Sequence, residues 1–332
     1  MQNKKGENMK KVGKFLPLFL VAPLLVGCGS NKKVEKPKFA DNGSSIEAEK
    51  FMEDLEKAQL SCKYSKEEKV GSFELKSSDR HSKKHTVTRG KNVADKKDTN
   101  IWSDATVQYD SSALLMASKG ETGYKITSEN KTFKEVEKLS FKVDAMAQGG
   151  QYSGANYLIA VDKKAKEYTP VELLSDELTL ADALDAEAKE GVMGIASGLS
   201  DLIEAYILSD EEGKKLYSFY NNDNVFTIEY NKPSEEVEVK DLKDEVYRVD
   251  SDSNYVKVQV DFTNDKMAYR FYSEYKSKSV YKKAVDGHAL DEVVEEEDLQ
   301  SAEAIAETKS VKLKAADVSK YTAIGFDLIS KE

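Results

Sequence analysis

The chain has 332 residues, of which 60 are Asp or Glu and 50 are Lys or Arg, so its formal net charge at pH 7 is −10. Arg grips phosphate with two parallel hydrogen bonds, and an acidic chain is repelled by phosphate polymers. The composition therefore argues against nucleic acid as a partner. The positive charge comes from 46 Lys and only four Arg, namely Arg80, Arg89, Arg248 and Arg270.

The first 27 residues have the pattern of an export signal. A basic segment, Lys10 to Lys14, precedes an uncharged apolar run of 12 residues from Phe15 to Val26. A helix that spans a membrane needs about 20 apolar residues, whereas the core of a signal peptide needs about 7 to 15. The run therefore predicts a signal peptide over residues 1–27, with either Met1 or Met9 as the start.

The apolar run ends in Leu25-Val26-Gly27-Cys28, which resembles the lipobox of bacterial lipoproteins at all four positions. The resemblance implies cleavage between Gly27 and Cys28 and a diacylglyceryl thioether on Cys28, with acyl chains such as palmitate. Two chains anchor durably, because each buried methylene contributes about 0.8 kcal/mol. We therefore expect a protein held at the extracytoplasmic side of the cell membrane. Removal of the signal takes away five Lys and one Glu, which leaves a net charge of −14.

The mature chain opens with a polar, Lys-rich segment over residues 28–43, which predicts a flexible tether. Ser44 and Glu47 then have the spacing of a capping box, and apolar residues recur at helical intervals from Ala48 to Ala58. We expect a helix that begins at Ser44 and packs its apolar side on the rest of the body.

Short β-prone runs fill the next hundred residues and predict an antiparallel meander. The segment 79–85, which contains His81 and His85, separates two of these runs and predicts a solvated loop. A second loop is expected at Gly149–Gly154. The candidate strands are residues 72–76, 86–89, 105–109, 114–118, 124–127, 132–136 and 157–161.

The pattern becomes helical from Val171 to Leu208, with one apolar stripe around Leu184, a stop at Gly191 and a second stripe around Leu199. Two β-hairpins are expected after it, because runs of alternating apolar and polar residues flank turn-forming residues. Their strands are Leu216–Tyr220, Val225–Tyr230, Tyr255–Phe262 and Tyr269–Tyr275.

This element order predicts an α+β fold, with an antiparallel sheet or an open half-barrel of meander form on which the N-terminal helix and the central helices pack. The body over residues 44–332 is either one large sheet or two helix-plus-meander units at 44–168 and 171–332. The order resembles the lipoprotein-carrier (LolA-like) superfamily, whose members include envelope lipoproteins that hold lipid. The resemblance rests on element order and identifies no binding residue.

The sequence shows no recognisable catalytic motif: we find no nucleophile elbow, phosphate-binding loop or dinucleotide fingerprint. The sequence therefore favours a protein that is not an enzyme and has no cofactor. His81 and His85 have a spacing that would suit a metal on a helix, but the segment around them is strongly basic. Cys62, the one cysteine besides Cys28, is expected to be a small, semi-buried residue.

Two acidic patterns resemble parts of cation sites. Asp250, Asp252 and Asn254 copy the first three ligand positions of a calcium loop, but Tyr255 stands where that loop requires Gly. We therefore expect a loop that leads into a hairpin there. The acidic run from Glu295 to Asp298 is interpreted as a solvated face or a mobile loop. No metal site is predicted.

Two functions remain open at this point. The first is a membrane-anchored, non-enzymatic lipoprotein that encloses a hydrophobic ligand such as lipid or acyl chains. The alternative is an interaction or structural lipoprotein with a solid core, whose acidic face binds a protein partner of the envelope or of a host.

Overall fold

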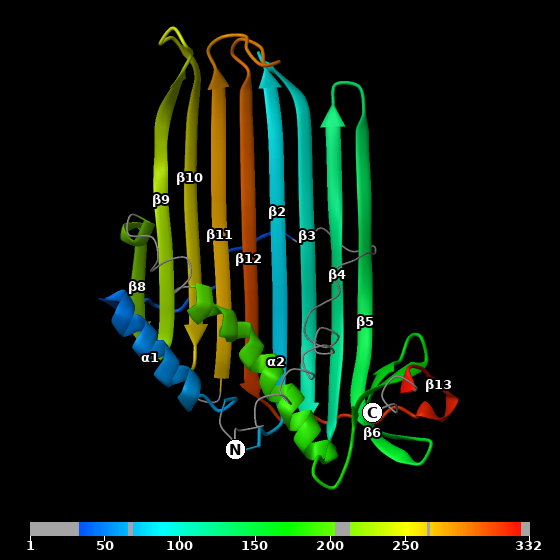
Figure 1. The fold of residues 1–332 in the computed structure, drawn as a ribbon. Helices are drawn as coiled ribbons and strands as arrows, with labels where there is room; N and C mark the ends of the chain where they lie inside the picture. Colours follow the sequence, from blue (N-terminus) through cyan, green and yellow to red (C-terminus); the bar gives the residue numbers. More distant parts are fainter. Residues whose placement is uncertain (1–32, 66–68, 203–212, 264–265, 327–332) are drawn as a thin grey trace, which may run out of the picture.

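The computed structural model describes residues 33–65, 69–202, 213–263 and 266–326, and for residues 195–202 and 213–214 it describes the backbone alone. The described chain forms one sheet of thirteen strands in the order β1-β8-β9-β10-β11-β12-β2-β3-β4-β5-β6-β7-β13 (Figure 1). β13 pairs with β7 in parallel, and the other neighbouring strands are antiparallel.

Among the described residues the helices are α1 (Ala48–Ser61) and α2 (Leu180–Leu202), with short 3₁₀ turns at η5 (Gly213–Leu216) and η6 (Val318–Lys320). The strands are β1 (Ser44–Ile46), β2 (Phe73–Arg89), β3 (Asn92–Asp110), β4 (Leu115–Asn130), β5 (Lys134–Tyr152), β6 (Ala155–Asp162), β7 (Glu167–Leu173), β8 (Tyr217–Asn222), β9 (Val225–Lys240), β10 (Val246–Asp261), β11 (Lys266–Tyr281), β12 (Val293–Thr308) and β13 (Thr322–Ala323).

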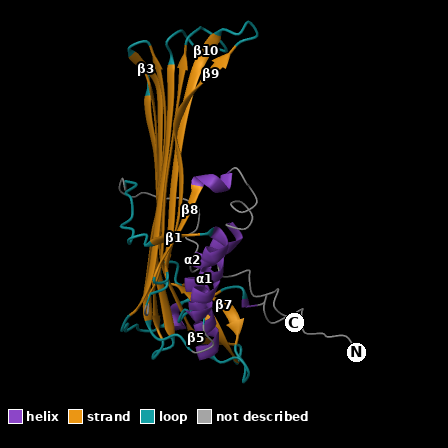
Figure 2. Cartoon of the chain, turned by 90° about the vertical axis from the view of Figure 1, so that its left-hand side faces the viewer, coloured by secondary structure: helices purple, strands orange, loops and turns teal. Residues whose placement is uncertain are grey.

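Eight of these strands, β2 to β5 and β9 to β12, are 16 to 19 residues long. At about 3.3 Å per residue, each extends for roughly 50 to 60 Å. Both helices lie against one end of these strands, as Figures 1 and 2 show. We call that end the proximal half, the other end the distal half, and the side of the sheet that carries α1 and α2 the helix face.

The apolar core lies between the helices and the proximal half. Phe51 and Leu55 of α1 are fully buried. Phe51 contacts Phe219 of β8 and Phe226 of β9, with ring centroids 5.3 and 5.5 Å away. α2 contributes Leu184, which is also fully buried. This core follows from the helical spacing of apolar residues, because such spacing places them along one side of each helix.

The opposite face of the proximal half is covered by the two ends of the described chain. Residues 33–43, which belong to the predicted tether, lie along it, and the Ala40 backbone N–H donates to Gln259 of β10 at 2.8 Å. Residues 311–326 cover a second apolar cluster around Ile159, in which Phe326 is buried. The proximal half is thus covered on both faces.

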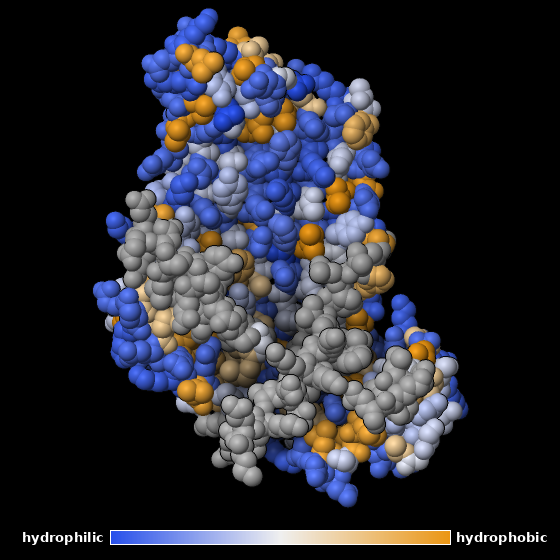
Figure 3. Space-filling model, in the orientation of Figure 1, coloured by the Kyte–Doolittle hydropathy of each residue, from blue (hydrophilic) through white to orange (hydrophobic). Residues whose placement is uncertain are grey.

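The distal half is different, because no described helix lies over either of its faces (Figure 2). Its side chains on the helix face are mostly hydrophilic, with isolated apolar ones (Figure 3). In β2, for example, the buried Phe73 and Leu75 are followed by residues from Lys76 to Thr86 that are almost all polar. The distal half is therefore held by backbone hydrogen bonds and cross-strand side-chain pairs.

The predicted α+β class was wrong, because strands dominate the described residues and helices are limited to α1 and α2. The reason is that polar segments expected to be loops continue the strands. Residues 79–85 lie inside β2, so the runs 72–76 and 86–89 belong to one strand. Polar side chains permit extended backbone wherever both faces of a strand are wet.

Two helix boundaries also differ from expectation. Ser44 begins β1, and α1 follows Glu47, which occupies the N-cap position without a side-chain capping bond. The capping-box prediction was therefore wrong. In the centre, α2 continues through Gly191 instead of ending there. The predicted helical stripe around Leu199 reaches into residues 203–208, which lie outside the described residues.

Both predicted hairpins are confirmed. β10 and β11 pair with Val258 across from Phe271, and β8 and β9 pair with Tyr220 across from Thr227. In contrast, the loop expected at Gly149–Gly154 is shorter, because β5 continues to Tyr152.

Candidate functional site

The distal half carries a polar hollow on the face opposite the helices, which we call the distal hollow. It has a volume of about 460 Å³ and is open to solvent. Its lining combines ammonium, hydroxyl and carboxylate groups from five strands, of which β2 is far from the other four in the sequence. The lining residues are Lys84 and Thr86 of β2, Ser234 of β9, Ser251 and Ser253 of β10, Lys276, Ser277 and Lys278 of β11, and Glu295, Glu296 and Glu297 of β12. β9 contributes a single serine.

Strand register explains why these groups meet. Lys84 stands directly across from Glu297, Glu297 across from Lys276, and Lys276 across from Ser253. Residues directly opposite one another in a sheet point to the same face. The floor of the distal hollow is therefore one row of side chains that crosses β2, β12, β11 and β10.

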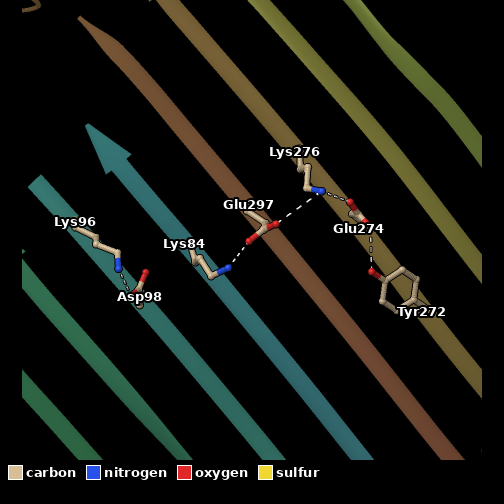
Figure 4. Close-up of polar contacts among 7 residues, drawn as sticks. All are labelled: Lys84, Lys96, Asp98, Tyr272, Glu274, Lys276 and Glu297. Atoms are coloured by element: carbon tan, nitrogen blue, oxygen red, sulfur yellow. Dashed lines mark hydrogen bonds and ion pairs between the residues drawn. The ribbon is translucent and has the colours of Figure 1, made fainter. Parts of the chain in front are cut away.

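The row forms a continuous set of polar contacts (Figure 4). The Lys84 ammonium donates to Glu297, and Lys276 Nζ lies 3.8 Å from the other carboxylate oxygen of Glu297. Lys276 also donates to Glu274, which accepts from the Tyr272 hydroxyl at 3.0 Å. The contacts fix alternating positive and negative charges across three strands.

These contacts stabilise the charged forms of the ionisable side chains in the row. The hydrogen bond from Lys276 lowers the pKa of Glu274, and the same bond raises the pKa of Lys276. Burial, with the neighbouring Glu274 carboxylate, raises the pKa of Tyr272 to about 12. Near neutral pH the row therefore keeps a fixed charge pattern. Such a pattern suits recognition of a polar surface better than proton transfer.

Two further ion pairs extend the pattern on the same face. Lys278 Nζ lies 3.1 Å from Glu295, and Lys96 Nζ lies 2.9 Å from Asp98 of β3. The pair with Asp98 raises the pKa of Lys96. Each exposed pair contributes only about 0.2 to 1 kcal/mol, so their main effect is to fix which charge lies where.

The two histidines lie on the helix face of β2, and the predicted loop around them was wrong. His81 Nε2 lies 2.8 Å from Asp298, and His85 Nδ1 lies 3.2 Å from Glu296, both on β12. Four residues along a strand cover roughly 13 Å. The two imidazoles are therefore placed apart, each beside its own carboxylate, and do not converge on one metal ion.

The calcium-like residues lie within β10, so the loop expected there was also wrong. Asp250 accepts from Arg248 and from the Ser279 hydroxyl, each at 2.7 Å, and Asp252 accepts from Lys232 at 2.6 Å. Alternate residues of a strand line one face without converging on a point. These carboxylates serve cross-strand contacts.

The acidic run from Glu295 to Asp298 belongs to β12, so the loop alternative for it was wrong. Its four carboxylates alternate between faces. Glu295 and Glu297 pair with lysines of the distal hollow, while Glu296 and Asp298 pair with the histidines of β2.

The predicted lipidation and cleavage residues, Cys28 and Gly27, lie outside the described residues. Cys62 is buried, more deeply than the semi-buried position expected from the sequence. Over the described ranges, no helix is long and apolar enough to cross a membrane. In the same part of the chain, no cluster of three or more His, Cys, Asp or Glu is placed to hold a metal ion.

Sequence reasoning missed the distal hollow. A signal was present in residues 273–280, where Glu274, Lys276 and Lys278 alternate with uncharged residues. Such alternation fits strands that are wet on both faces, but it does not say which strands are neighbours.

Comparison with known proteins gives little further guidance. No family model matches the chain, and no curated protein matches it. Among solved structures, the outer membrane protease OmpT from Escherichia coli aligns with 74% of this chain and 100% of its own, at 8% identity and a TM-score of 0.19. OccK7 (OpdD) of Pseudomonas aeruginosa aligns with 71% of this chain and 100% of its own, at 6% identity and a TM-score of 0.16. Similarity this low supports no argument about fold or activity.

Proposed function

We propose that this protein is a non-enzymatic interaction lipoprotein, anchored through Cys28 at the extracytoplasmic side of the membrane, whose distal half binds a partner in the envelope or beyond it. The observation that carries the proposal is the distal half itself. It extends past α1 and α2 with no described helix over it (Figure 2), its helix face is mostly hydrophilic (Figure 3), and the distal hollow on its opposite face is lined by polar and charged residues.

The energetics of the distal half support this function. A sheet normally gains its stability by burying one face, and the proximal half does so under the helices. The distal half buries far less apolar surface, so its length is not needed to build the core. A long, ordered and wet sheet is instead suited to presenting fixed rows of charge, such as Lys84, Glu297 and Lys276, to another molecule.

The hydrophobic-ligand hypothesis has weaker support. α1 and α2 do cover an apolar sheet surface, as a lipid carrier would require. However, the described apolar side chains there contact one another, as Phe51 does with Phe219 and Phe226. The distal hollow, in turn, is lined by polar and charged groups. We therefore place the binding surface on the distal half.

The anchor can be tested by metabolic labelling with an alkyne-tagged fatty acid. The native chain is expected to take up the label, and Cys28→Ser is expected to lose it. Cys62→Ser is the matched control, because Cys62 is the other cysteine and is buried. Labelling that persists in Cys28→Ser, or that depends on Cys62, would show that the proposed anchor is wrong.

The partner can be tested in cells with a photo-cross-linking amino acid. Placed at Ser253, in the distal hollow, it is expected to give one defined adduct. Placed at Lys57, on the exposed side of α1, it is expected to give none. Equal adducts at both positions, or none at Ser253, would contradict display by the distal half.

Native mass spectrometry of residues 30–332 with a bacterial lipid extract tests the competing hypothesis. An unshifted mass agrees with the interaction function. A stoichiometric lipid adduct would instead establish a carrier.

A further inference from the structure

The distal half has two free edges, on β5 and on β9. β6 pairs with β5 only from Ala145 onward, and β8 pairs with β9 only as far as Tyr230. Within the described residues, the stretches Lys134–Val143 and Asn231–Lys240 therefore each have a strand neighbour on one side only. The backbone groups on the other side of such an edge are available to pair with another strand.

The β9 edge is protected against such pairing. Pro233 has no backbone N–H to donate to an added strand. The register against β10 also shifts between Asp252 and Asn254, which marks a bulge at the same place. Proline and bulges are the usual means by which proteins close an edge.

The β5 edge has neither feature. Its register with β4 runs without a shift from Met116 across from Ala147 to Glu129 across from Lys134. The stretch Lys134–Val143 contains no proline. Val136 is 52% exposed and Phe141 is 40% exposed, so the edge also presents apolar surface. It is a regular strand of ten residues, long enough to pair with a peptide.

On the face opposite the helices, the charge of this edge favours an occupant with acidic side chains. Lys125 of β4 stands directly across from Lys138, on the face opposite the helices, and this adds a further positive charge beside the edge. Two carboxylates of β4 on that face stand across from this stretch: Glu129 pairs with Lys134 at 2.7 Å, and Glu121 stands across from Lys142. Glu135 and Glu137 of the stretch itself lie on the helix face. The helix face of the same stretch carries the exposed ring of Phe141. Three lysines repeat on the face opposite the helices, namely Lys134, Lys138 and Lys142.

A second copy of β5 does not fit this edge. Antiparallel pairing that continues the sheet would bring the same faces of two β5 strands together, because side chains alternate between faces. The lysine rows of both copies would then share one face. Like charges placed side by side on a sheet are destabilising.

We propose that the β5 edge over Lys134–Val143 binds an extended partner segment by strand addition, and that this segment carries acidic residues at alternate positions with apolar residues between them. Backbone hydrogen bonds supply the pairing, and the lysine row and Phe141 select the side chains. The inference rests on the proposed display function, since it names the chemistry of the partner that the distal half receives.

Fluorescence anisotropy with a labelled ten-residue peptide of alternating Glu and Val tests the proposal. We expect saturable binding to the body, residues 30–332, and much weaker binding of the matching Lys and Val peptide. The combined substitution Lys134→Glu, Lys138→Glu and Lys142→Glu is expected to weaken binding of the Glu peptide about tenfold or more. The same variant is expected to bind the Lys peptide better, which separates recognition from loss of folding.

Amide hydrogen exchange distinguishes strand addition from loose electrostatic adsorption. Bound peptide is expected to slow exchange within Lys134–Val143 and to leave Asn231–Lys240 unchanged. A Glu and Val peptide methylated on every Val nitrogen is expected to bind less well, because one of its edges cannot donate hydrogen bonds.

Three outcomes would overturn the proposal: no binding of the Glu peptide, equal binding of both peptides, or protection away from β5. Self-association of the body through β5 would overturn it as well. None of these outcomes alters the cross-linking result at Ser253, so failure at the edge remains distinguishable from failure of the proposed function.

Discussion

Phe51 of α1 stands edge-on to Phe226 of β9, with ring centroids 5.5 Å apart and planes at 89°. Both rings are buried, and this contact joins the N-terminal helix to the proximal half of the sheet. Edge-to-face pairs of this kind add stabilisation beyond the area they bury. α1 is thus fixed to a strand that follows it by more than 160 residues in the sequence.

Phe51→Ala is expected to lower the free energy of unfolding by about 3 to 5 kcal/mol, because it removes a buried ring and leaves a cavity. Urea denaturation followed by circular dichroism measures this. Leu60→Ala is the control on the same helix, since Leu60 is 69% exposed, and it is expected to change stability by less than about 0.5 kcal/mol. Similar losses in the two variants would mean that α1 does not pack through Phe51.

Gly123 of β4 lies against Trp102, the only tryptophan in the chain. A Cβ at Gly123 would lie 2.6 Å from the Leu139 carbonyl oxygen and 2.6 Å from Trp102 Cζ2. Gly123→Ala is therefore expected to cost about 1 to 3 kcal/mol, because backbone must shift to accept the methyl group. Tryptophan fluorescence is expected to move to longer wavelength as the indole becomes more exposed.

The matched control for this substitution is Gly71→Ala, because a Cβ at Gly71 meets no atom within 4 Å. It is expected to leave the fluorescence and the unfolding midpoint nearly unchanged. An unperturbed Gly123→Ala protein would show that Trp102 does not need the close approach.

The proximal half could be predicted from the sequence where one face of a strand is buried. Alternation from Tyr255 to Phe262 identified the β10–β11 hairpin, because burial of one side forces apolar and polar residues to alternate. The spacing of Phe51 and Leu55 identified α1 for the same reason. Its first residue was misjudged, because Ser44 pairs with Asn221 of β8, a partner far away in the sequence.

The distal half could not be predicted in this way. Residues Ser77 to His85 of β2 have no apolar alternation, so local pattern favours a loop there, and only pairing with β12 and β3 makes them a strand. The distal hollow depends on contacts such as Lys84 with Glu297, which are 213 residues apart. Only the register of the strands brings these residues together.

Glu292 at the distal end of β12 is fully buried and predicts an acid-sensitive contribution to stability. Burial opposes its charged form, but hydrogen bonds from His288, the Ala289 backbone N–H and Arg89 outweigh burial and lower the pKa of Glu292 to about 2. The pKa is depressed in the folded state. The stabilisation is therefore present above pH 4.5, the ordinary value, and is lost as the pH falls toward 2.

Glu292→Gln is expected to reduce stability at pH 7 by about 1 to 3 kcal/mol, because it removes a charged acceptor of three hydrogen bonds. The difference from the native chain is expected to shrink between pH 4.5 and pH 2. Denaturant titrations at several pH values measure it, with the exposed Glu238→Gln as control. A difference that stays constant down to pH 2 would contradict this role for Glu292.

Glu187 of α2 is expected to act in the opposite direction. Burial, reinforced by the nearby charges of Glu190 and Glu172, raises its pKa to about 7. Because the pKa is raised in the folded state, stability is expected to fall as the pH rises from 4.5 to 7.

Glu187→Gln removes this loss, so its Tm is expected to exceed that of the native chain by roughly 2 to 4 °C at pH 8, as about 1 kcal/mol would give in a protein of this size. The two are expected to converge near pH 4.5, whereas the exposed Glu56→Gln is expected to follow the native chain throughout. A Tm advantage of Glu187→Gln that does not vary with pH would mean that the carboxylate is already neutralised by its surroundings.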